Sequence, residues 1–216
     1  MRFNDFVKYM GEYSFDQLPG QDAQLRMAPG LRREEIRSMG SGNKPVESGV
    51  MILIFPGENE QAHTVLIKRP LYDGVHSGQI SFPGGRREKS DRSITETALR
   101  ETQEEIGVEP AAVDVTGKLT DLYIPPSNYI VSPVVGLMHE KPLFTADEKE
   151  VDRILEIPVN VFFDDRFIEN VPINMSSGEC IKTPCFLFNG HIIWGATAMI
   201  LSEFKEMFAN IMNNAG

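Results

Sequence analysis

The sequence predicts an α/β fold in which a mixed β-sheet lies between helices. Strand-like and helix-like segments alternate along the chain without internal repeats, which favours this class over all-α or all-β folds. One segment, residues 93–106, has a clear helix signature with both ends marked. The length of 216 residues fits one domain with an extension, or at most two small domains. With 41% apolar and 24% charged residues, the chain can form a sizeable core.

The first part of the chain, residues 1–47, is predicted to be an N-terminal helical extension. Its apolar residues recur at helical spacing, and prolines and glycines then break the run. These residues are Phe3, Phe6, Val7 and Met10, followed by Pro19, Gly20, Pro29 and Gly30. Residues 39–49 resemble a linker or turn. The main domain is therefore expected to span residues 48–216.

Two apolar segments at the start of the main domain are typical of paired, buried strands. They are VMILIF at residues 50–55 and HTVLIKR at residues 63–69, and a turn separates them. A glycine-punctuated loop with one strand-like piece, QISF, then leads to Gly85.

The helix predicted at residues 93–106 has a capping box, because Glu96 lies three residues after Ser93. Gly107 is placed to end it. At about 100° per residue, one face of this helix must be buried. That face carries Ile94, Ala98, Leu99, Thr102 and Ile106.

The C-terminal half predicts further alternating elements. They are a mixed strand at residues 113–124, an apolar run at 130–138, an acid-rich helix or loop at 146–155, a strand at 186–194 and an amphipathic helix from 196 to 212. Cys180 and Cys185 are the only cysteines, too few for a zinc site, and we expect free thiols.

The charge balance excludes one class of partner. Asp and Glu number 31 against 21 Lys and Arg, a formal net charge of −10, which argues against a general nucleic-acid binder. An acidic protein can still bind a polyanion when divalent cations lie between the two. No apolar run is long enough to span a membrane, and the N-terminal residues do not resemble a targeting peptide, so we expect a cytoplasmic protein.

Three carboxylates cluster on one flank of the predicted helix. Glu101, Glu104 and Glu105 lie within one turn, where like charges destabilise a helix. Mg²⁺ or Mn²⁺ would remove this repulsion, because hard cations prefer carboxylate oxygens. Gly84 and Gly85 precede the helix and let the backbone approach a metal or substrate closely. The simpler alternative is a solvated acidic helix face, but a metal site that hydrolyses a diphosphate explains the combination better.

The segment from Arg100 to Val108, RETQEEIGV, resembles the core of the Nudix box. That pattern runs Gly, five residues, Glu, seven residues, then Arg-Glu-apolar-x-Glu-Glu-x-Gly-apolar. Here Asp91 stands where the first Glu belongs, eight residues separate it from Arg100, and Thr102 replaces the apolar residue. These departures concern the loop more than the helix carboxylates.

Other segments are similar to one subgroup, the coenzyme A pyrophosphatases. These are residues 76–85 (HSGQISFPGG), 97–101 (TALRE) and 190–198 (GHIIWGATA), and the resemblance covers roughly residues 48–208. In that subgroup an Arg usually lies four residues before Gly78, where this chain has Gly74, whereas Arg69 matches an earlier basic position.

The resemblance implies a Nudix α/β/α sandwich and a role for each residue of the box. Glu101, Glu104 and Glu105 would bind Mg²⁺ or Mn²⁺, with the Gly85 carbonyl as a further candidate ligand. Arg100 would orient the helix carboxylates through charged hydrogen bonds. A carboxylate outside the box often acts as the base. Glu150 is our choice among the later acids, against the alternative of a solvated turn.

The reaction implied is hydrolysis of coenzyme A or its thioesters to adenosine 3′,5′-bisphosphate and 4′-phosphopantetheine. A rival within the same class is hydrolysis of ADP-ribose or of another nucleotide, including an oxidised nucleoside triphosphate. A rival from another class is a nucleotide-sensing Nudix domain without catalysis. The partner expected is a small-molecule nucleotide, with neither nucleic acid nor membrane, and a homodimer is a possible assembly.

Several other residues remain candidates for contact with the substrate. Lys68, Arg69, Arg86 and Arg87 flank the glycine loop, and their cations would suit phosphates, although ordinary surface charge is the alternative for each. His76 is interpreted as structural more readily than as a proton carrier. We expect no chemical role for His191. Trp194, the only tryptophan, is expected to pack in the core in preference to stacking on a base.

Overall fold

The computed structural model describes residues 1–30, 33, 36, 44–71, 77–125, 127–174 and 178–214. Its helices are α1 (Phe3–Gly11), α2 (Gln21–Leu25), α4 (Ile94–Ile106), α5 (Asn160–Phe163) and α6 (Gly195–Asn214). Its strands are β1 (Val46–Pro56), β2 (Ala62–Lys68), β3 (Ile80–Ser81), β4 (Gly84–Arg86), β5 (Asp114–Lys118), β6 (Leu122–Ile124), β7 (Tyr129–Leu137), β8 (Arg153–Pro158), β9 (Ile168–Asn174), β10 (Cys180–Phe188) and β11 (His191–Ile193).

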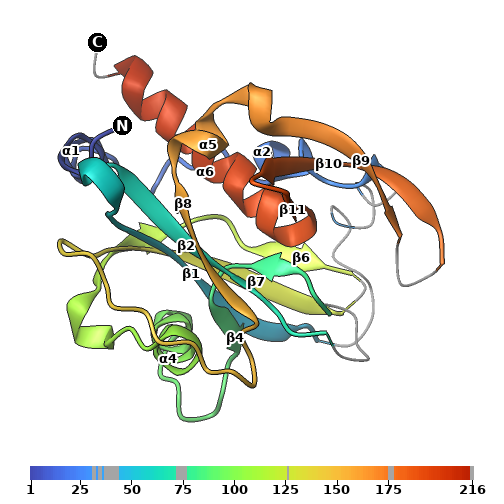
Figure 1. The fold of residues 1–216 in the computed structure, drawn as a ribbon, viewed down its shortest axis with the longest axis horizontal. Helices are drawn as coiled ribbons and strands as arrows, with labels where there is room; N and C mark the ends of the chain where they lie inside the picture. The colour runs from blue at the N-terminus through green and yellow to red at the C-terminus, as the bar shows by residue number, and fades with distance from the viewer. Residues whose placement is uncertain are drawn as a thin grey trace.

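Eight of these strands form one mixed sheet, as predicted. The strands run in the order β3-β2-β1-β7-β5, while β4 pairs with β1, β6 with β7 and β8 with β2. Among the strands of the described residues, only β1 and β7 pair in parallel, from Val46↔Tyr129 to Ile54↔Leu137. A second sheet is antiparallel, in the order β11-β10-β9, and lies beside α6 (Figure 1).

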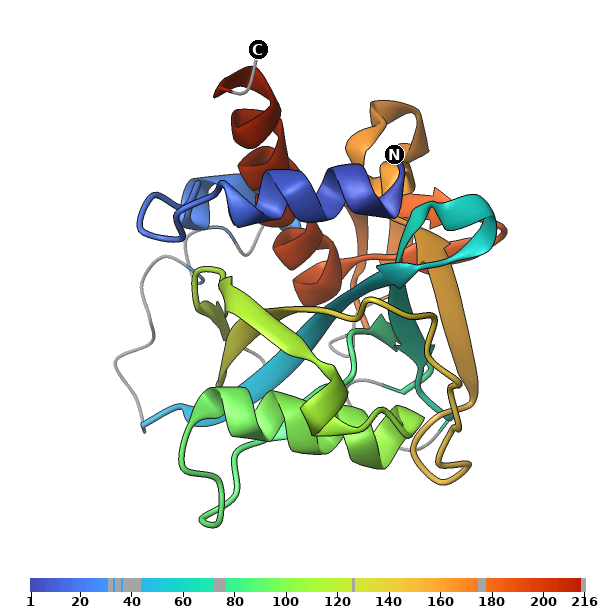
Figure 2. The same ribbon diagram turned by 90° about the vertical axis from the view of Figure 1, so that its left-hand side faces the viewer.

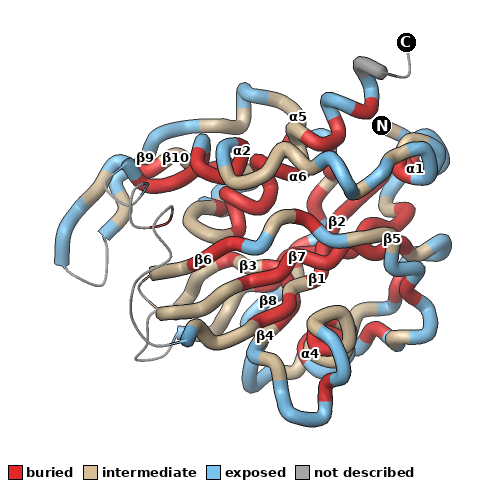
Figure 3. Tube along the Cα trace, turned by 180° about the vertical axis from the view of Figure 1, so that it is seen from behind, coloured by how far each residue is buried: buried red, intermediate tan, exposed pale blue. Residues whose placement is uncertain are grey.

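The central strand β1 is buried on both faces, which accounts for its unbroken apolar run. Side chains alternate along a strand, so Ile52 and Ile54 point to one core cluster. Met51, Leu53 and Phe55 point to a second cluster on the opposite face. Burial in Figure 3 is continuous through this part of the sheet.

The sheet therefore lies between two helical layers (Figure 2). Helix α4 covers one face, where Ala98 and Ile106 pack against β1 in the second cluster. Helices α1 and α6 cover the other face, where Phe6 stacks on Phe208 with ring centroids 4.8 Å apart. This is the predicted α/β/α arrangement.

The helical character predicted for residues 1–47 is present in α1 and α2, and both pack into the main core. A buried carboxylate of α6 holds α2 in place. Glu203 accepts hydrogen bonds from the Gln24 side chain (2.8 Å) and from the backbone N–H groups of Gly20 and Thr120 (3.2 Å each). The boundary at residue 47 stays a prediction.

Four predicted segments differ in detail. Residues 186–194 form a hairpin instead of one strand, because Asn189 (φ 49°) and Gly190 (φ 79°) adopt the left-handed turn that joins β10 to β11. Residues 113–124 divide into β5 and β6, and the acid-rich segment 146–155 becomes a turn that enters β8. In the predicted linker 39–49, β1 has already begun at Val46, and residues 39–43 lie outside the described part of the chain.

Candidate active site

Helix α4 begins and ends where the sequence predicts. The Ser93 hydroxyl accepts a hydrogen bond from the Glu96 N–H (3.2 Å), and Gly107 closes the helix with φ 74°. The Glu96 carboxylate accepts from the N–H of Arg92 (2.7 Å) instead of from the cap residue. Both ends are thus fixed by local contacts, which define the positions of the carboxylates along the helix.

The buried face of α4 differs from the predicted one. Ala98, Thr102 and Ile106 are buried as expected, whereas Ile94 and Leu99 are only partly buried. Glu105 takes a place on the buried face instead, with its side chain only 1% exposed.

Glu105 is held against the glycine loop. Its carboxylate accepts a hydrogen bond from the Gly84 N–H (2.8 Å) and lies 3.6 Å from the Arg69 guanidinium. Arg69 also donates to the Gly84 carbonyl (3.2 Å), so strand β2, the loop and α4 meet at this point. Burial raises the pKa of Glu105 to about 7, although Arg69 and the Gly84 N–H lower it, and the charges of Glu101 and Glu150 raise it further.

Glu101 lies one turn earlier, and its carboxylate rests against the backbone of Gly85. A Cβ at Gly85 would overlap that carboxylate, so only glycine leaves room for it. Burial raises the pKa of Glu101 as well, and the charges of Glu104 and Glu150 add to this effect. The structure therefore brings Glu101, Glu105 and Gly85 together, as the sequence predicts.

Arg100 links the helix to the preceding loop. It donates to Asp91 (3.0 and 3.1 Å), to Glu101 and Glu104 (2.9 Å each) and to the Arg86 carbonyl (3.1 Å). The buried Asp91 carboxylate also accepts from the Glu88 N–H and the Thr97 hydroxyl, 2.9 Å each. The hydrogen bond from Arg100 holds the pKa of Asp91 well below its usual range. Asp91 thus anchors Arg100 despite the altered spacing.

The four candidate phosphate-binding cations have different surroundings. Arg69, Arg86 and Lys68 line the main cavity, although Lys68 also pairs with Asp152 at 2.7 Å. Arg87 does not line it. Its guanidinium pairs with Glu47 (2.8 Å) and donates to two carbonyls of the loop before α4, which is a structural role.

The glutamates of α4 also differ in whether they line the cavity. Glu101 and Glu105 line the cavity, whereas Glu104 does not and has a side chain 57% exposed. Glu150 lines the cavity from the loop between β7 and β8, where the N–H of Asp147 bonds to the Glu105 carbonyl (3.0 Å).

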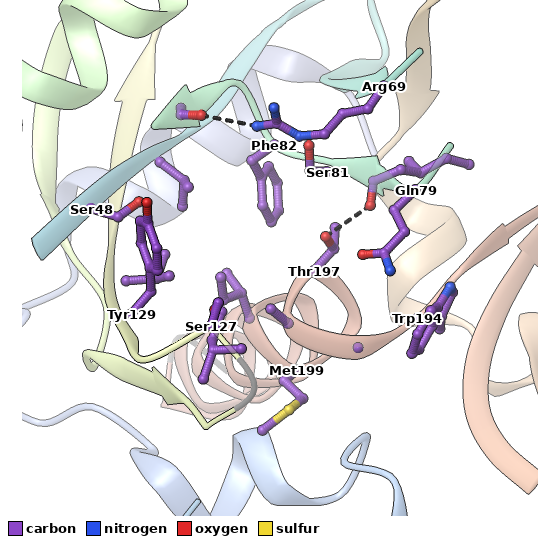
Figure 4. Close-up of a pocket in the computed structure, with 18 of the residues that line it drawn as sticks. Ser48, Arg69, Gln79, Ser81, Phe82, Ser127, Tyr129, Trp194, Thr197 and Met199 are labelled. Carbon is purple, nitrogen blue, oxygen red and sulfur yellow. Dashed lines mark hydrogen bonds between the residues drawn. The ribbon is translucent and has the colours of Figure 1, made fainter. Parts of the chain in front are cut away.

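The cavity itself has a volume of about 900 Å³ and lies between the main sheet, α6 and the second sheet (Figure 4). The carboxylate site opens into it. Its walls include residues that the sequence analysis did not single out: Ser48, Gln79, Tyr123, Ser127, Tyr129, Asn174 and Met199. These come from strands, loops and helix α6, far apart in the chain, so no local pattern could identify them.

Trp194 corrects one expectation, because its half-buried indole lines the cavity instead of packing in the core. His191 lies on the same wall. His76 and Gly74 lie outside the described residues. Cys180 is exposed and Cys185 is buried, and both are free thiols as predicted.

The donor set fits a hard divalent cation. Within the described ranges, no three His, Cys, Asp or Glu side chains already converge as a complete metal site. However, Glu101, Glu105 and Glu150 line one cavity, and their mutual repulsion contributes to the raised pKa values of the first two. A cation among them would relieve this repulsion, and carboxylate and carbonyl oxygens are the ligands that Mg²⁺ and Mn²⁺ prefer.

The fold and this site together define an α/β protein whose carboxylate helix and glycine loop face a ligand-sized cavity. Residues 46–165 match the family described as the NUDIX domain, which is more than half of the chain. The chain belongs to the Nudix family.

Several known proteins are similar to it. Nudix hydrolase 22, chloroplastic, from Arabidopsis thaliana is 32% identical over 164 residues, covering 73% of this chain and 54% of the relative. The chain thus spans about half the length of that relative. An uncharacterized Nudix hydrolase, NudL, from Pectobacterium atrosepticum is 36% identical over 142 residues, covering 65% of this chain and 72% of NudL. The crystal structure of the Nudix hydrolase RenU from M. smegmatis shares the fold, with a TM-score of 0.54, 13% identity and coverage of 80% and 97%.

Proposed function

We propose that this chain is a divalent-metal-dependent hydrolase that cleaves the phosphoanhydride bond of a nucleoside diphosphate linked to a second moiety. The observation that carries the proposal is the meeting of Glu101, Glu105 and the Gly84–Gly85 loop at a cavity of about 900 Å³. That volume suits a small-molecule ligand. The chain retains all three box glutamates, which favours catalysis over nucleotide sensing alone.

Coenzyme A or a thioester of it is the substrate that we favour, giving adenosine 3′,5′-bisphosphate and 4′-phosphopantetheine. The support is the sequence resemblance over residues 76–85, 97–101 and 190–198. Hydrolysis of ADP-ribose is the alternative, since it shares the adenosine diphosphate part and needs the same carboxylates.

Each residue has a distinct part in this reaction. When bound, Mg²⁺ or Mn²⁺ would neutralise charge on the phosphoryl oxygens and favour ionisation of the attacking water. Glu101 and Glu105 would hold the cation, with Glu104 and the Gly85 carbonyl as further candidate ligands. Arg69 presents a fixed positive charge beside the diphosphate position, and Arg100 keeps Glu101 oriented. Glu150, which lines the same cavity, would accept a proton from the attacking water.

The central experiment measures kcat/KM for coenzyme A, an acyl-coenzyme A, dephospho-coenzyme A, ADP-ribose and an oxidised nucleoside triphosphate with Mg²⁺ and with Mn²⁺. We expect coenzyme A or its thioester to give the highest value. A higher value for ADP-ribose would overturn the substrate assignment. If the chain binds one of these compounds but cleaves none of them, the alternative of a nucleotide-sensing domain without catalysis is favoured.

Two variants test the metal site itself. Glu105→Gln is expected to lower kcat at least about 100-fold, because the loss of a charged ligand withdraws several kcal/mol of transition-state stabilisation. Glu96→Gln, on the same helix but outside the cavity lining, is the matched control and should retain activity. Millimolar Mg²⁺ or Mn²⁺ should also raise the Tm, and EDTA or Glu101→Gln should reduce that rise.

A further inference from the structure

The cavity has two unlike sides, and the carboxylate site lies between them. The first turns of α6 contact both β3 and β6, and β11 contacts β3. Consequently Gln79 and Trp194 stand on one side of the cavity, while Ser48, Ser127 and Tyr129 stand on the other (Figure 4). Arg69, bonded to the Gly84 carbonyl, lies above the space between them. A substrate with a central diphosphate would place its two halves on these two sides.

The Trp194 side presents a flat aromatic surface to the cavity. Among the residues that the structure describes, its indole N–H has no hydrogen-bond partner and its ring pairs with no other aromatic ring. The junction that carries it is rigid, because the buried Thr197 hydroxyl donates to the Ile80 carbonyl (2.9 Å). Gln79 stands on the same side with a polar side chain (Figure 4), and Asn174 and His191 also line the cavity. A planar, polar-edged ring is the ligand that such a surface suits.

The opposite side is mainly apolar. Ile124, Pro125, Tyr129 and Met199 line it, and the buried Ser127 hydroxyl has no hydrogen-bond partner within the described ranges. A buried hydroxyl without a partner is costly, so a ligand that supplies one is favoured. This side therefore suits a flexible arm with apolar and amide groups better than it suits a nucleobase.

We propose that Trp194 is the platform for the nucleobase, so that the adenine ring stacks on its indole while the second half of the substrate extends along Tyr129 and Met199. The proposal rests on the proposed function in one respect, that the substrate is a nucleoside diphosphate derivative. It assigns a direction to that substrate within the cavity.

The wild-type chain tests this without any variant, because Trp194 is its only tryptophan. The probes are AMP, adenosine 3′,5′-bisphosphate and 4′-phosphopantetheine, none of which contains a phosphoanhydride bond to cleave. Fluorescence is excited at the red edge of the indole band, where adenine does not absorb, and free N-acetyltryptophanamide corrects for collisional quenching. We expect saturable quenching by both adenine nucleotides and little change with phosphopantetheine. The reverse pattern would overturn the proposal.

Calorimetry on variants adds a second measurement. Trp194→Ala should weaken AMP binding roughly tenfold or more, as expected for the loss of one base–aromatic stack, and Trp194→Phe should restore most of it. Phosphopantetheine binding should stay unchanged in both. Tyr129→Ala and Met199→Ala should weaken phosphopantetheine binding and leave AMP binding unchanged. AMP binding that is unaffected in a folded Trp194→Ala variant would contradict the assignment.

The binding data and the turnover data separate the two proposals. If the chain hydrolyses coenzyme A but Trp194→Ala binds AMP as tightly as the wild type, the proposed hydrolase function is supported and the role of Trp194 in nucleobase binding is refuted. If AMP quenches the fluorescence and Trp194→Ala weakens AMP binding, but coenzyme A is not hydrolysed, the role of Trp194 in nucleobase binding is supported. Coenzyme A is then refuted as the substrate.

Discussion

Asp91 keeps the geometry of the site although the local sequence departs from the family pattern. It has one methylene fewer than the expected glutamate, and one additional residue separates it from Arg100. Even so, its carboxylate bonds to Arg100, to the Thr97 hydroxyl and to the Glu88 N–H. The sequence could not predict this, because the path of the loop decides whether a shorter side chain can reach the helix.

Asp91→Asn should destabilise the fold at neutral pH by about 2 kcal/mol, because it removes a buried, charge-assisted bond to Arg100. The pKa of Asp91 is lowered in the folded chain. The contribution of the Asp91 charge to the free energy of unfolding is therefore fully present above the unfolded-state pKa of about 4. It is lost as the pH falls from that value through the lower pKa of the folded chain. Urea unfolding of both proteins at neutral and acidic pH measures the difference. An equal gap at both pH values would show that the Asp91 charge contributes nothing.

Glu150 and Glu148 form a matched pair for testing the base. Both lie exposed in the loop between β7 and β8, but only Glu150 lines the cavity. Glu150→Gln should lower kcat by about 10²- to 10⁴-fold, the usual effect of losing general-base catalysis. Glu148→Gln should leave kcat unchanged. Equal activity of the two variants would remove Glu150 from the mechanism.

At the scale of elements, the approach of the glycine loop to α4 determines the shape of the site. Gly85→Ala should lower kcat at least about tenfold, because the new Cβ would push the Glu101 carboxylate from its place. The Tm should change little, since the end of a flexible side chain can move. Gly49→Ala is the contrasting variant: its Cβ would meet the Ile94 carbonyl, part of the α4 backbone, and should cost about 1–3 kcal/mol of stability. Thermal unfolding and steady-state kinetics distinguish the two outcomes, and a large fall in the Tm of Gly85→Ala would contradict this account.

How far the sequence predicts each element depends on how local its determinants are. Helix α4 follows from Ser93 and Gly107, which act within one turn, and β1 follows from its continuous apolar run. The walls of the cavity do not follow from such patterns. Tyr129 reaches the cavity through the long-range pairing of β7 with β1, and Trp194 reaches it through the packing of α6 and β11 near β3, so no feature of their own segments indicates these positions.

On the scale of the whole molecule, Glu203 joins three regions of the chain. Glu203→Ala should lower the free energy of unfolding by about 3 kcal/mol, because it leaves the donors of Gln24, Gly20 and Thr120 without their acceptor. Glu203→Gln should cost less, since its remaining side-chain oxygen can still accept from the N–H groups of Gly20 and Thr120, and only the Gln24 amide loses its acceptor. Chemical denaturation measures both variants. An equal loss for Gln and Ala would show that the charge of Glu203, and not its acceptor oxygens, holds the three regions together.

The parallel pairing of β1 with β7 also bears on the order in which the molecule folds. Each contact along this pair joins residues far apart in the sequence, and the glycine loop and α4 lie in the intervening chain. Closing so long a segment costs entropy before the strands repay it, and such non-local pairing slows folding. A nascent chain that ends before β7 leaves one edge of β1 unpaired and offers Glu101 and Glu105 no finished cavity. The finished cavity is therefore among the last features that the chain acquires during its synthesis.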